Sequence, residues 1–308
     1  MEDIIDIAGK LSETDAAIAR WERVLRNNPR EESAQEMIAT LDKRRNELEG
    51  AFAEAAEREF LDVCSYRMAL EENEPPKVSA LARALSDFQS LLTVVYDALK
   101  NGPKDQAKVS ADSTNESALE FGYSFAGSVG FVMTMPNERL LFGESNLDLA
   151  MKLIFEMAKA KETGQIAAYA KQVGVAPVRK IYQWADDHVS YGMDADIKWL
   201  RNQHIRSELR VNVPELQKLK ETIDRTSEDK TESVEVEGLL VGADVKTCKF
   251  HMTFQEAAEI KGDLSEELVK KGGEIPVNRH YKGTLLKTTK IYYSIEKEAV
   301  SWVLLSLK

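Results

Sequence analysis

The first 59 residues of the chain carry apolar side chains with the period of an α-helix. Between Ile4 and Leu25 these side chains recur at spacings of three and four, which places them on one face of a helix. A second stretch, from about residue 30 to residue 56, repeats the pattern. Asn27-Asn28-Pro29 separates the two, because proline keeps the residue before it out of helical geometry. The pattern predicts an antiparallel helical hairpin over residues 1–59.

A hairpin of this length buries too little apolar surface to stand alone, so its apolar stripes need a covering partner. The body of the same chain is the default partner. A second copy in a coiled coil and a different protein are the alternatives, and two or three heptads per helix do not separate them. The residues expected at this interface are Ile4, Leu11, Ile18, Trp21, Leu25, Leu41, Leu48 and Phe52.

Residues 60–226 mix strand-like and helix-like patterns in irregular order. This order favours an α+β domain over a regular doubly wound sheet. Strands are expected at 60–68, 119–123, 129–135, 194–201 and 207–211. Helices are expected at 78–100, 145–162, 164–173, 176–190 and, briefly, after Asn212.

The last part of the chain has a different character. Residues 227–233 are uniformly polar and predict a linker. Residues 234–308 contain five or six short strand-like runs with glycines at the turns. Such runs are typical of a small β-barrel of the OB or SH3-like type. The complete expectation is an α+β chain: a coiled-coil-like hairpin at 1–59, an α+β domain at 60–226, a linker, and a barrel at 234–308.

Composition narrows the class of protein. No run of about 18 apolar residues is present, so no transmembrane helix and no membrane partner are expected. The acidic start, Met1-Glu2-Asp3, lacks the basic and apolar pattern of a secretory signal. Two cysteines, Cys64 and Cys248, are too few for a disulfide framework. We therefore expect a cytoplasmic protein.

Charge argues against binding of nucleic acid by bulk attraction. The net charge is −11, and residues 1–59 alone carry 9 basic and 15 acidic side chains. Between residues 270 and 290, however, basic side chains and tyrosines gather within the predicted barrel. Such a surface can hold a single strand by charge and stacking, although lysines on strand edges also prevent edge-to-edge pairing. The residues of this possible nucleic-acid face are Lys271, Arg279, Tyr281, Lys282, Lys287 and Lys290.

Asp194, Asp196 and Lys198 alternate along one predicted strand and so share one of its faces. Asp196-Ile197-Lys198 has the spacing of the (D/E)-x-K motif of metal-dependent nucleases, in which acids hold a divalent ion and the lysine helps to activate water. A nuclease also needs a further acid on a neighbouring strand, and Asp186 and Asp187 are expected at a helix end instead. The solvent-facing side of an edge strand is the simpler interpretation.

One serine sits in a pattern similar to a nucleophile elbow, Gly122-Tyr123-Ser124-Phe125-Ala126. That elbow needs a helix after the serine, whereas a second strand is expected here. His188 is the one plausible downstream base in the middle domain, and the four histidines show no metal-ligand spacing. A strand of a β-hairpin explains the pattern better.

The sequence thus holds no convincing catalytic set. We expect a non-enzymatic interaction or accessory protein without a cofactor, which forms a homodimer or docks another protein through its hairpin and presents the barrel for binding. Two alternatives stay open. One is a metal-dependent nuclease or hydrolase centred on Asp194, Asp196 and Lys198, which would need a divalent metal. The other is a barrel that binds single-stranded nucleic acid.

Overall fold

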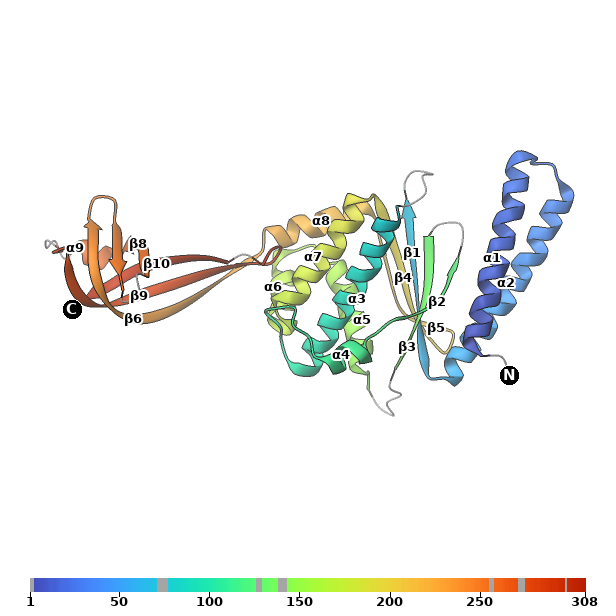
Figure 1. Ribbon diagram of the computed structural model, residues 1–308, viewed down its shortest axis with the longest axis horizontal. Coiled ribbons are helices and arrows are strands. Elements are labelled where there is room, and N and C mark those ends of the chain that lie inside the picture. Colours follow the sequence, from blue (N-terminus) through green and yellow to red (C-terminus); the bar gives the residue numbers. More distant parts are fainter. Residues whose placement is uncertain are drawn as a thin grey trace. The chain divides into compact units, whose positions relative to one another are not determined.

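The computed structural model describes residues 3–70, 77–125, 129–137, 143–254, 258–270, 275–296 and 298–308. The chain divides into two compact units, Met1–Arg225 and Thr226–Lys308. The first contains a helix pair and a sheet with helices, and the second is a five-stranded barrel (Figure 1). The α+β fold class predicted from the sequence is confirmed.

A five-stranded antiparallel sheet in the order β2-β3-β1-β4-β5 organises the first unit. β1 lies in the middle, where Tyr66 is opposite Phe131 of β3 and Ile197 of β4. The strands are β1 (Leu61–Leu70), β2 (Glu120–Phe125), β3 (Val129–Pro136), β4 (Met193–Arg201) and β5 (His204–Val211).

Helices cover one face of this sheet (Figure 1). Alternate residues of β4, among them Ile197 and Trp199, turn their side chains into this layer and are fully buried, while their neighbours stay partly exposed. The helices are α3 (Val78–Asn101), α4 (Ala111–Glu116), α5 (Asn146–Ala158), α6 (Thr163–Val173), α7 (Val175–Ser190) and α8 (Val213–Asp224).

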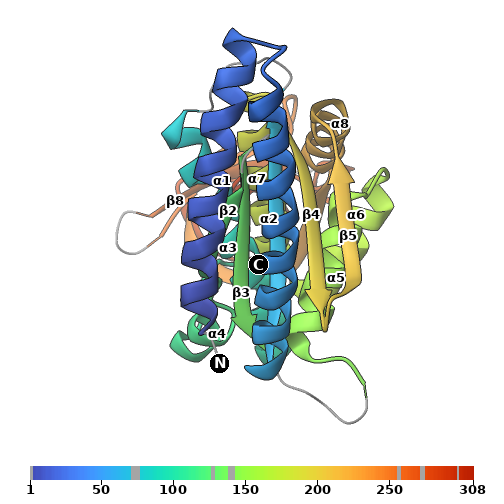
Figure 2. The same cartoon turned by 90° about the vertical axis from the view of Figure 1, so that its right-hand side faces the viewer.

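The helix pair α1 (Ile4–Asn27) and α2 (Glu32–Arg58) lies against the other face of the sheet (Figure 2). One end of the pair makes the contact: Leu11 and Phe52 share a buried apolar cluster with Tyr123 of β2. The rings of Phe52 and Tyr123 meet edge to face at 5.1 Å between centroids. The predicted hairpin is therefore present, and the body of its own chain covers part of its apolar surface.

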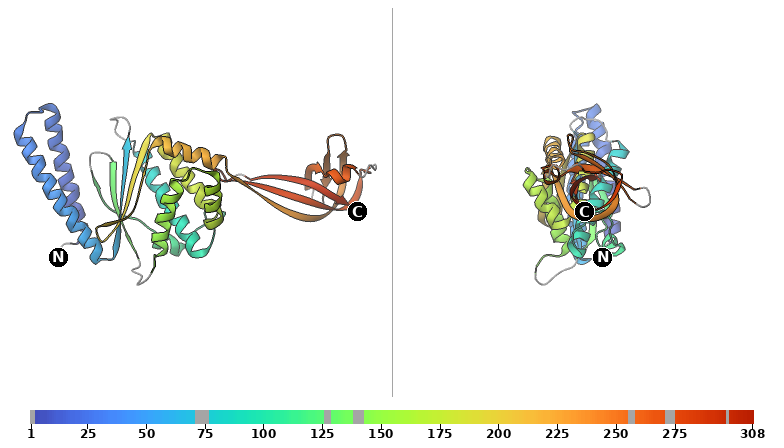
Figure 3. Two further views of the ribbon diagram at one scale, coloured as in Figure 1. Left: turned by 180° about the vertical axis from the view of Figure 1, so that it is seen from behind. Right: turned by 90° about the vertical axis from the view of Figure 1, so that its left-hand side faces the viewer.

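The second unit closes into a barrel in the strand order β10-β8-β7-β6-β9 (Figure 3). Its core contains Leu240, Phe250, Met252, Leu285 and Leu304. The elements are β6 (Ser227–Asp244), β7 (Lys249–Thr253), β8 (Glu259–Leu264), α9 (Glu266–Lys270), β9 (Arg279–Tyr292) and β10 (Glu298–Leu307).

The polar stretch 227–233 is strand, so the expectation of a linker there is wrong. These residues form the first part of β6 and pair with β9, from Ser227 opposite Tyr292 to Ser233 opposite Leu286. All seven side chains are exposed, so the stretch shows no alternation of apolar and polar residues. Backbone pairing without burial leaves no periodic signal in a sequence, and this is why the strand was missed.

Gly174 sets the junction between α6 and α7. Its φ is +90°, and a Cβ atom there would collide with the backbone of Lys104. Lys104 is held in this place by two hydrogen bonds: its amide donates to the Val173 carbonyl at 2.9 Å, and its carbonyl accepts from the Ala176 amide at 2.9 Å. The segment after α3 is thereby fixed to the helix layer.

Replacing Gly174 with alanine should therefore destabilise the fold. We expect Gly174→Ala to lower the free energy of unfolding by about 2–3 kcal/mol in a urea titration, because both the left-handed backbone and the contact with Lys104 resist a side chain. Gly164→Ala is the matched control within α6, where a Cβ atom meets nothing within 4 Å. Equal free energies of unfolding for the two variants would contradict this assignment.

Candidate functional site

Asp194, Asp196 and Lys198 lie on β4, which pairs with β1 on one side and β5 on the other. The interpretation of this strand as an edge strand is therefore wrong. The Asp194 carboxylate accepts a hydrogen bond from the Val213 amide at 2.8 Å and thus supports the start of α8. Asp196 forms an ion pair with Arg210 of β5 at 3.4 Å. Asp194 and Asp196 thus bond to different neighbours, and Lys198 lies opposite Ser65 of β1 and Glu208 of β5.

The strands beside β4 bring cations to Asp196. Its cross-strand neighbours are Arg67 on β1 and Arg210 on β5, which occupy the positions where a nuclease would need further acids. Asp186 instead forms an ion pair with Lys220. Within the described ranges of the chain, no group of three or more His, Cys, Asp or Glu side chains is arranged to hold a metal ion.

The serine of the elbow-like pattern lies in a β-hairpin. Ser124 is opposite Phe131, and β2 pairs antiparallel with β3, as the simpler interpretation predicted. Ala126 lies outside the described residues, as do Gly127 and Ser128. His188 is fully buried in the helix layer and hydrogen-bonds to Tyr66, so it is engaged elsewhere.

Tyr66, Trp184 and His188 form a buried polar network that the sequence did not reveal. The Trp184 indole N–H donates to the Tyr66 hydroxyl at 2.7 Å, and that hydroxyl lies 2.5 Å from His188 Nε2. His188 Nδ1 lies 2.8 Å from the Met193 carbonyl oxygen, which fixes the proton on Nδ1 and leaves Nε2 to accept from Tyr66. Because every polar atom of the network has a partner and the side chains are buried, the network serves packing.

Two carboxyl groups meet beside this network. Asp187 of α7 lies against Asp87 of α3, with Arg83 at 3.9 Å. Burial, followed by the hydrogen bond and the charge of Asp87, raises the pKa of Asp187 to about 6. Burial has the opposite effect on a base and lowers the pKa of His188 to about 4. Relative to the unfolded chain, the pKa of Asp187 is therefore raised, whereas the pKa of its sequence neighbour His188 is lowered.

Arg201, at the end of β4, lies between two carboxylates. It donates two hydrogen bonds to Asp62 of β1, at 2.9 and 2.7 Å, and two to Asp148 of α5, at 3.2 and 2.5 Å. Asn137, just after β3, donates to Asp62 at 2.6 Å, and Ser145 caps α5 while donating to Asn137. Hydrogen bonds with Asp62 raise the pKa of Arg201 well above its usual range. This cluster joins three strands to the start of α5.

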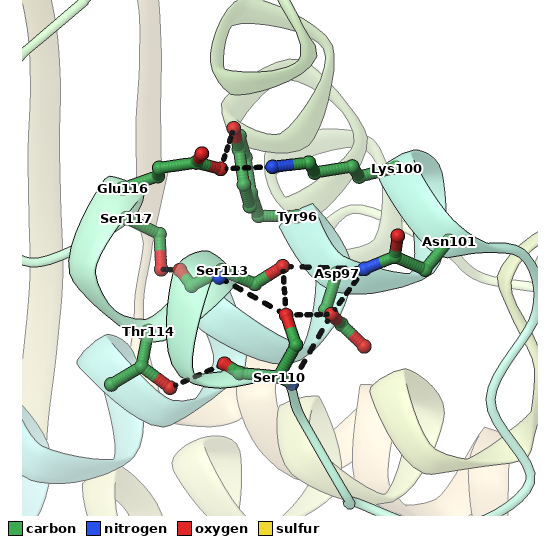
Figure 4. A network of polar contacts seen from close by, with 9 residues as sticks. All are labelled: Tyr96, Asp97, Lys100, Asn101, Ser110, Ser113, Thr114, Glu116 and Ser117. Carbon is green, nitrogen blue, oxygen red and sulfur yellow. Dashed lines mark hydrogen bonds and ion pairs between the residues drawn. The ribbon is translucent and has the colours of Figure 1, made fainter.

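A second polar cluster holds α4 to α3 (Figure 4). Asp97 is fully buried and accepts from Asn101 at 2.7 Å and from the Ser110 hydroxyl at 3.1 Å, and it forms an ion pair with Lys104 at 2.7 Å. Burial alone would raise the pKa of Asp97, but these bonds and one from Ser113 hold it well below its usual range. The cluster therefore stabilises the ionised carboxylate.

The residues predicted for a nucleic-acid face of the barrel have different contacts in the structure. The Tyr281 hydroxyl donates to the Pro276 carbonyl at 2.9 Å, and the side chain packs against the barrel core. Lys282 forms an ion pair with Glu237 at 3.4 Å, and Lys287 with Glu232 at 2.6 Å. Arg279 and Lys290 also lie on β9, and Lys271 lies outside the described residues.

A wide, open cavity of about 740 Å³ lies elsewhere on the barrel surface, on β6, β7, β8 and β10. Phe250, His251 and Trp302 line it, together with Lys249 and Lys261. The two lysines form ion pairs with Asp263 and Glu259. The cavity therefore combines aromatic side chains with charges of both signs, a lining that suits a partner with apolar and polar groups.

The eight predicted interface residues of the hairpin have two environments. Leu11 and Phe52 are buried in the cluster on the sheet, and Ile4 and Leu48 pack against it. Ile18 is buried, and the residues nearer the turn are half-buried: Trp21, Leu25 and Leu41. Around these three, Val24 is 40% exposed and Met37 is 41% exposed. The turn end of the pair leans away from the sheet (Figure 1).

Comparison with protein-family models, curated proteins and solved structures finds no match for this chain. Among the helices of the described residues, none is both long and apolar enough to cross a membrane.

The opposite pKa shifts of Asp187 and His188 predict that the stability of the protein changes little between pH 6 and 4. Between about pH 6.5 and 4 the unfolded chain takes up a proton at His188 that the folded protein does not, so this group lowers stability as pH falls. Between about pH 6 and 3.8 the folded protein takes up a proton at Asp187 that the unfolded chain does not, which raises stability. The two contributions oppose each other.

Asp187→Asn removes the compensating group. We expect the urea midpoint of this variant to fall as the pH is lowered from 6 to 4, with a loss of about 2–3 kcal/mol, whereas the wild-type midpoint stays nearly constant. Asp186→Asn, at a half-buried neighbour that pairs with Lys220 and makes the smallest contribution to the raised pKa of Asp187, should stay close to the wild-type profile. If Asp187→Asn also gives a flat profile, the two shifts do not oppose each other as described.

Proposed function

We propose that this chain is a non-enzymatic interaction protein of the cytoplasm that associates through the turn end of its helical hairpin. The observation that carries the proposal is the exposure of Val24 and Met37 beside the half-buried Trp21, Leu25 and Leu41. These side chains lie on a helix pair whose other end is anchored by Leu11 and Phe52 in the cluster on the sheet. Exposed apolar residues on an anchored element are a common basis for association.

The engagement of the polar residues supports a role without catalysis. The groups with the most unusual environments, such as Asp97, Arg201 and His188, are bonded to other parts of the same fold. Catalytic groups need a free position against a substrate. Asp196, the centre of the nuclease alternative, has arginines opposite it on both neighbouring strands.

Charge on the turn end favours a second copy of this chain as the partner. Among residues 18–41, the exposed charges of α1 are Arg20, Arg23 and Arg26 with one acid, Glu22, whereas those of α2 are Glu32 and Glu36. A two-fold axis that sets α1 of one copy against α2 of the other brings the opposite charges together around the apolar residues. The hairpin is therefore complementary to itself in this arrangement.

The barrel supplies a second binding surface in this proposal. The cavity lined by Phe250, His251 and Trp302 has the volume of a typical ligand site. A homodimer would present two such cavities. This arrangement is that of an accessory subunit, in which one module sets the assembly and the other holds a ligand or partner.

Particle mass in solution tests the association. We expect light scattering of the full-length protein to give twice the chain mass of 34.6 kDa, and Val24→Glu combined with Met37→Glu to give the single-chain mass, because charges would enter the apolar contact. Ile5→Glu is the control, since Ile5 is 73% exposed at the other end of α1. A wild-type protein that remains at 34.6 kDa at every concentration would rule out the homodimer.

The nuclease alternative is tested by cleavage. With Mg²⁺ or Mn²⁺ and single- or double-stranded DNA and RNA, we expect wild type and Asp196→Ala to show the same background, because Arg67 and Arg210 neutralise the position of the missing acid. Metal-dependent cleavage by wild type that disappears in Asp196→Ala would replace the interaction proposal with the nuclease. Binding of single strands by the barrel would show instead as an affinity that falls steeply with salt.

A further inference from the structure

A cavity of about 630 Å³ lies in the first unit, between α8, the end of β5 and the connection from α5 to α6. Figure 2 shows these elements together along one side of the sheet. Small side chains, Ala158, Ala160 and Val211, line the cavity, and all three are buried. Because these side chains are short, they leave the space of the cavity unfilled. The volume falls within the range of small-molecule sites.

The longer side chains around this cavity are predominantly basic. Lys159 and Lys161 come from the α5–α6 connection, Arg210 from β5, Lys218 from α8 and Arg225 from the position directly after α8. Among the described residues that line it, the acids are Glu215 and Glu221. This balance is unusual in a chain whose net charge is −11. On α8 the lining residues 215, 218 and 222 follow helical spacing, so one face of this helix is turned toward the cavity.

Both acids are committed to their own helix. Glu215 accepts from the Asn212 amide at 3.0 Å in the capping box of α8. Glu221 accepts from Gln217 at 3.1 Å and forms an ion pair with Arg225 at 3.5 Å. Glu221 offsets Arg225, and Arg210 is paired with Asp196 of β4 at 3.4 Å, so the remaining cations among the described lining residues are the three lysines.

The lysines of the cavity keep their charges available. Lys159 donates to the Glu208 carbonyl, a neutral group, at 3.2 Å. In the part of the chain that the structure describes, neither Lys161 nor Lys218 has an ion pair with an acid. Like charges gathered at one cavity repel one another, and a multiply charged anion relieves this repulsion.

We propose that this cavity binds a small polyanion that carries phosphate groups. Lysine and arginine are the side chains that recognise phosphate oxygens, as point charges and as planar forks respectively. No aromatic side chain is found among the described residues that line the cavity, so a nucleobase would have no ring to stack on. The chemistry therefore recognises a phosphate chain or cluster rather than a base. The site is independent of the hairpin.

Calorimetric titration of the full-length protein with sodium tripolyphosphate at low salt tests the site. We expect saturable binding that weakens as salt is added. Lys161→Gln combined with Lys218→Gln should weaken it by about tenfold or more, because two charged contacts to the ligand are removed. Lys171→Gln, an exposed lysine of α6 away from the cavity, is the matched control and should bind as the wild type does.

Three outcomes would overturn the proposal. The first is the absence of binding at low salt. The second is equal weakening by the Lys171 variant, which would mean a diffuse surface effect. The third is a single-stranded oligonucleotide that binds more tightly than tripolyphosphate and whose binding is lost in the double variant, which would assign the cavity to a nucleic-acid backbone. Unchanged thermal unfolding of all variants excludes misfolding as the cause, since the substituted lysines are exposed.

Discussion

The placement of Arg201 between two carboxylates is the interaction on which the first unit depends. Asp62 is fully buried at the start of β1, and Asp148 is buried in the first turn of α5. Breaking a buried ion pair by removing one partner costs about 3–5 kcal/mol, because the other charges remain without compensation. The guanidinium therefore fixes the helix layer to one face of the sheet. The opposite face is left for the hairpin, and this division determines which surfaces are exposed.

Several polar groups of the first unit hold its helices and strands together. Asp97 fastens α4 to α3, and His188 and Tyr66 satisfy each other beneath the helix layer. Asp194 and Asp196, which share a strand, are assigned to the start of α8 and to Arg210. Three surface features are open to a ligand or partner. They are the turn end of the hairpin, the cavity of the barrel and the basic cavity beside α8.

Periodicity predicted the parts of this fold in which burial alternates. The buried residues of β4 and the apolar stripes of α1 and α2 could be predicted because each repeats at the period of its element. The strand at 227–233 could not be predicted in this way, because none of its side chains is buried. The surroundings of the candidate site residues depend on residues that are distant in the sequence. Nothing near Asp196 in the sequence indicates that Arg67 and Arg210 lie opposite it, and Arg201 carries no local sign of its two carboxylates.

Hydrogen exchange over a range of protein concentrations measures whether the turn end of the hairpin is the interface between two copies that we propose. Backbone amides of residues 18–41 should gain protection as concentration rises through the dissociation constant. Those of residues 4–11, which are already packed on the sheet, should not change. Equal protection of residues 18–41 at every concentration, in a protein that remains a single chain, would contradict the homodimer.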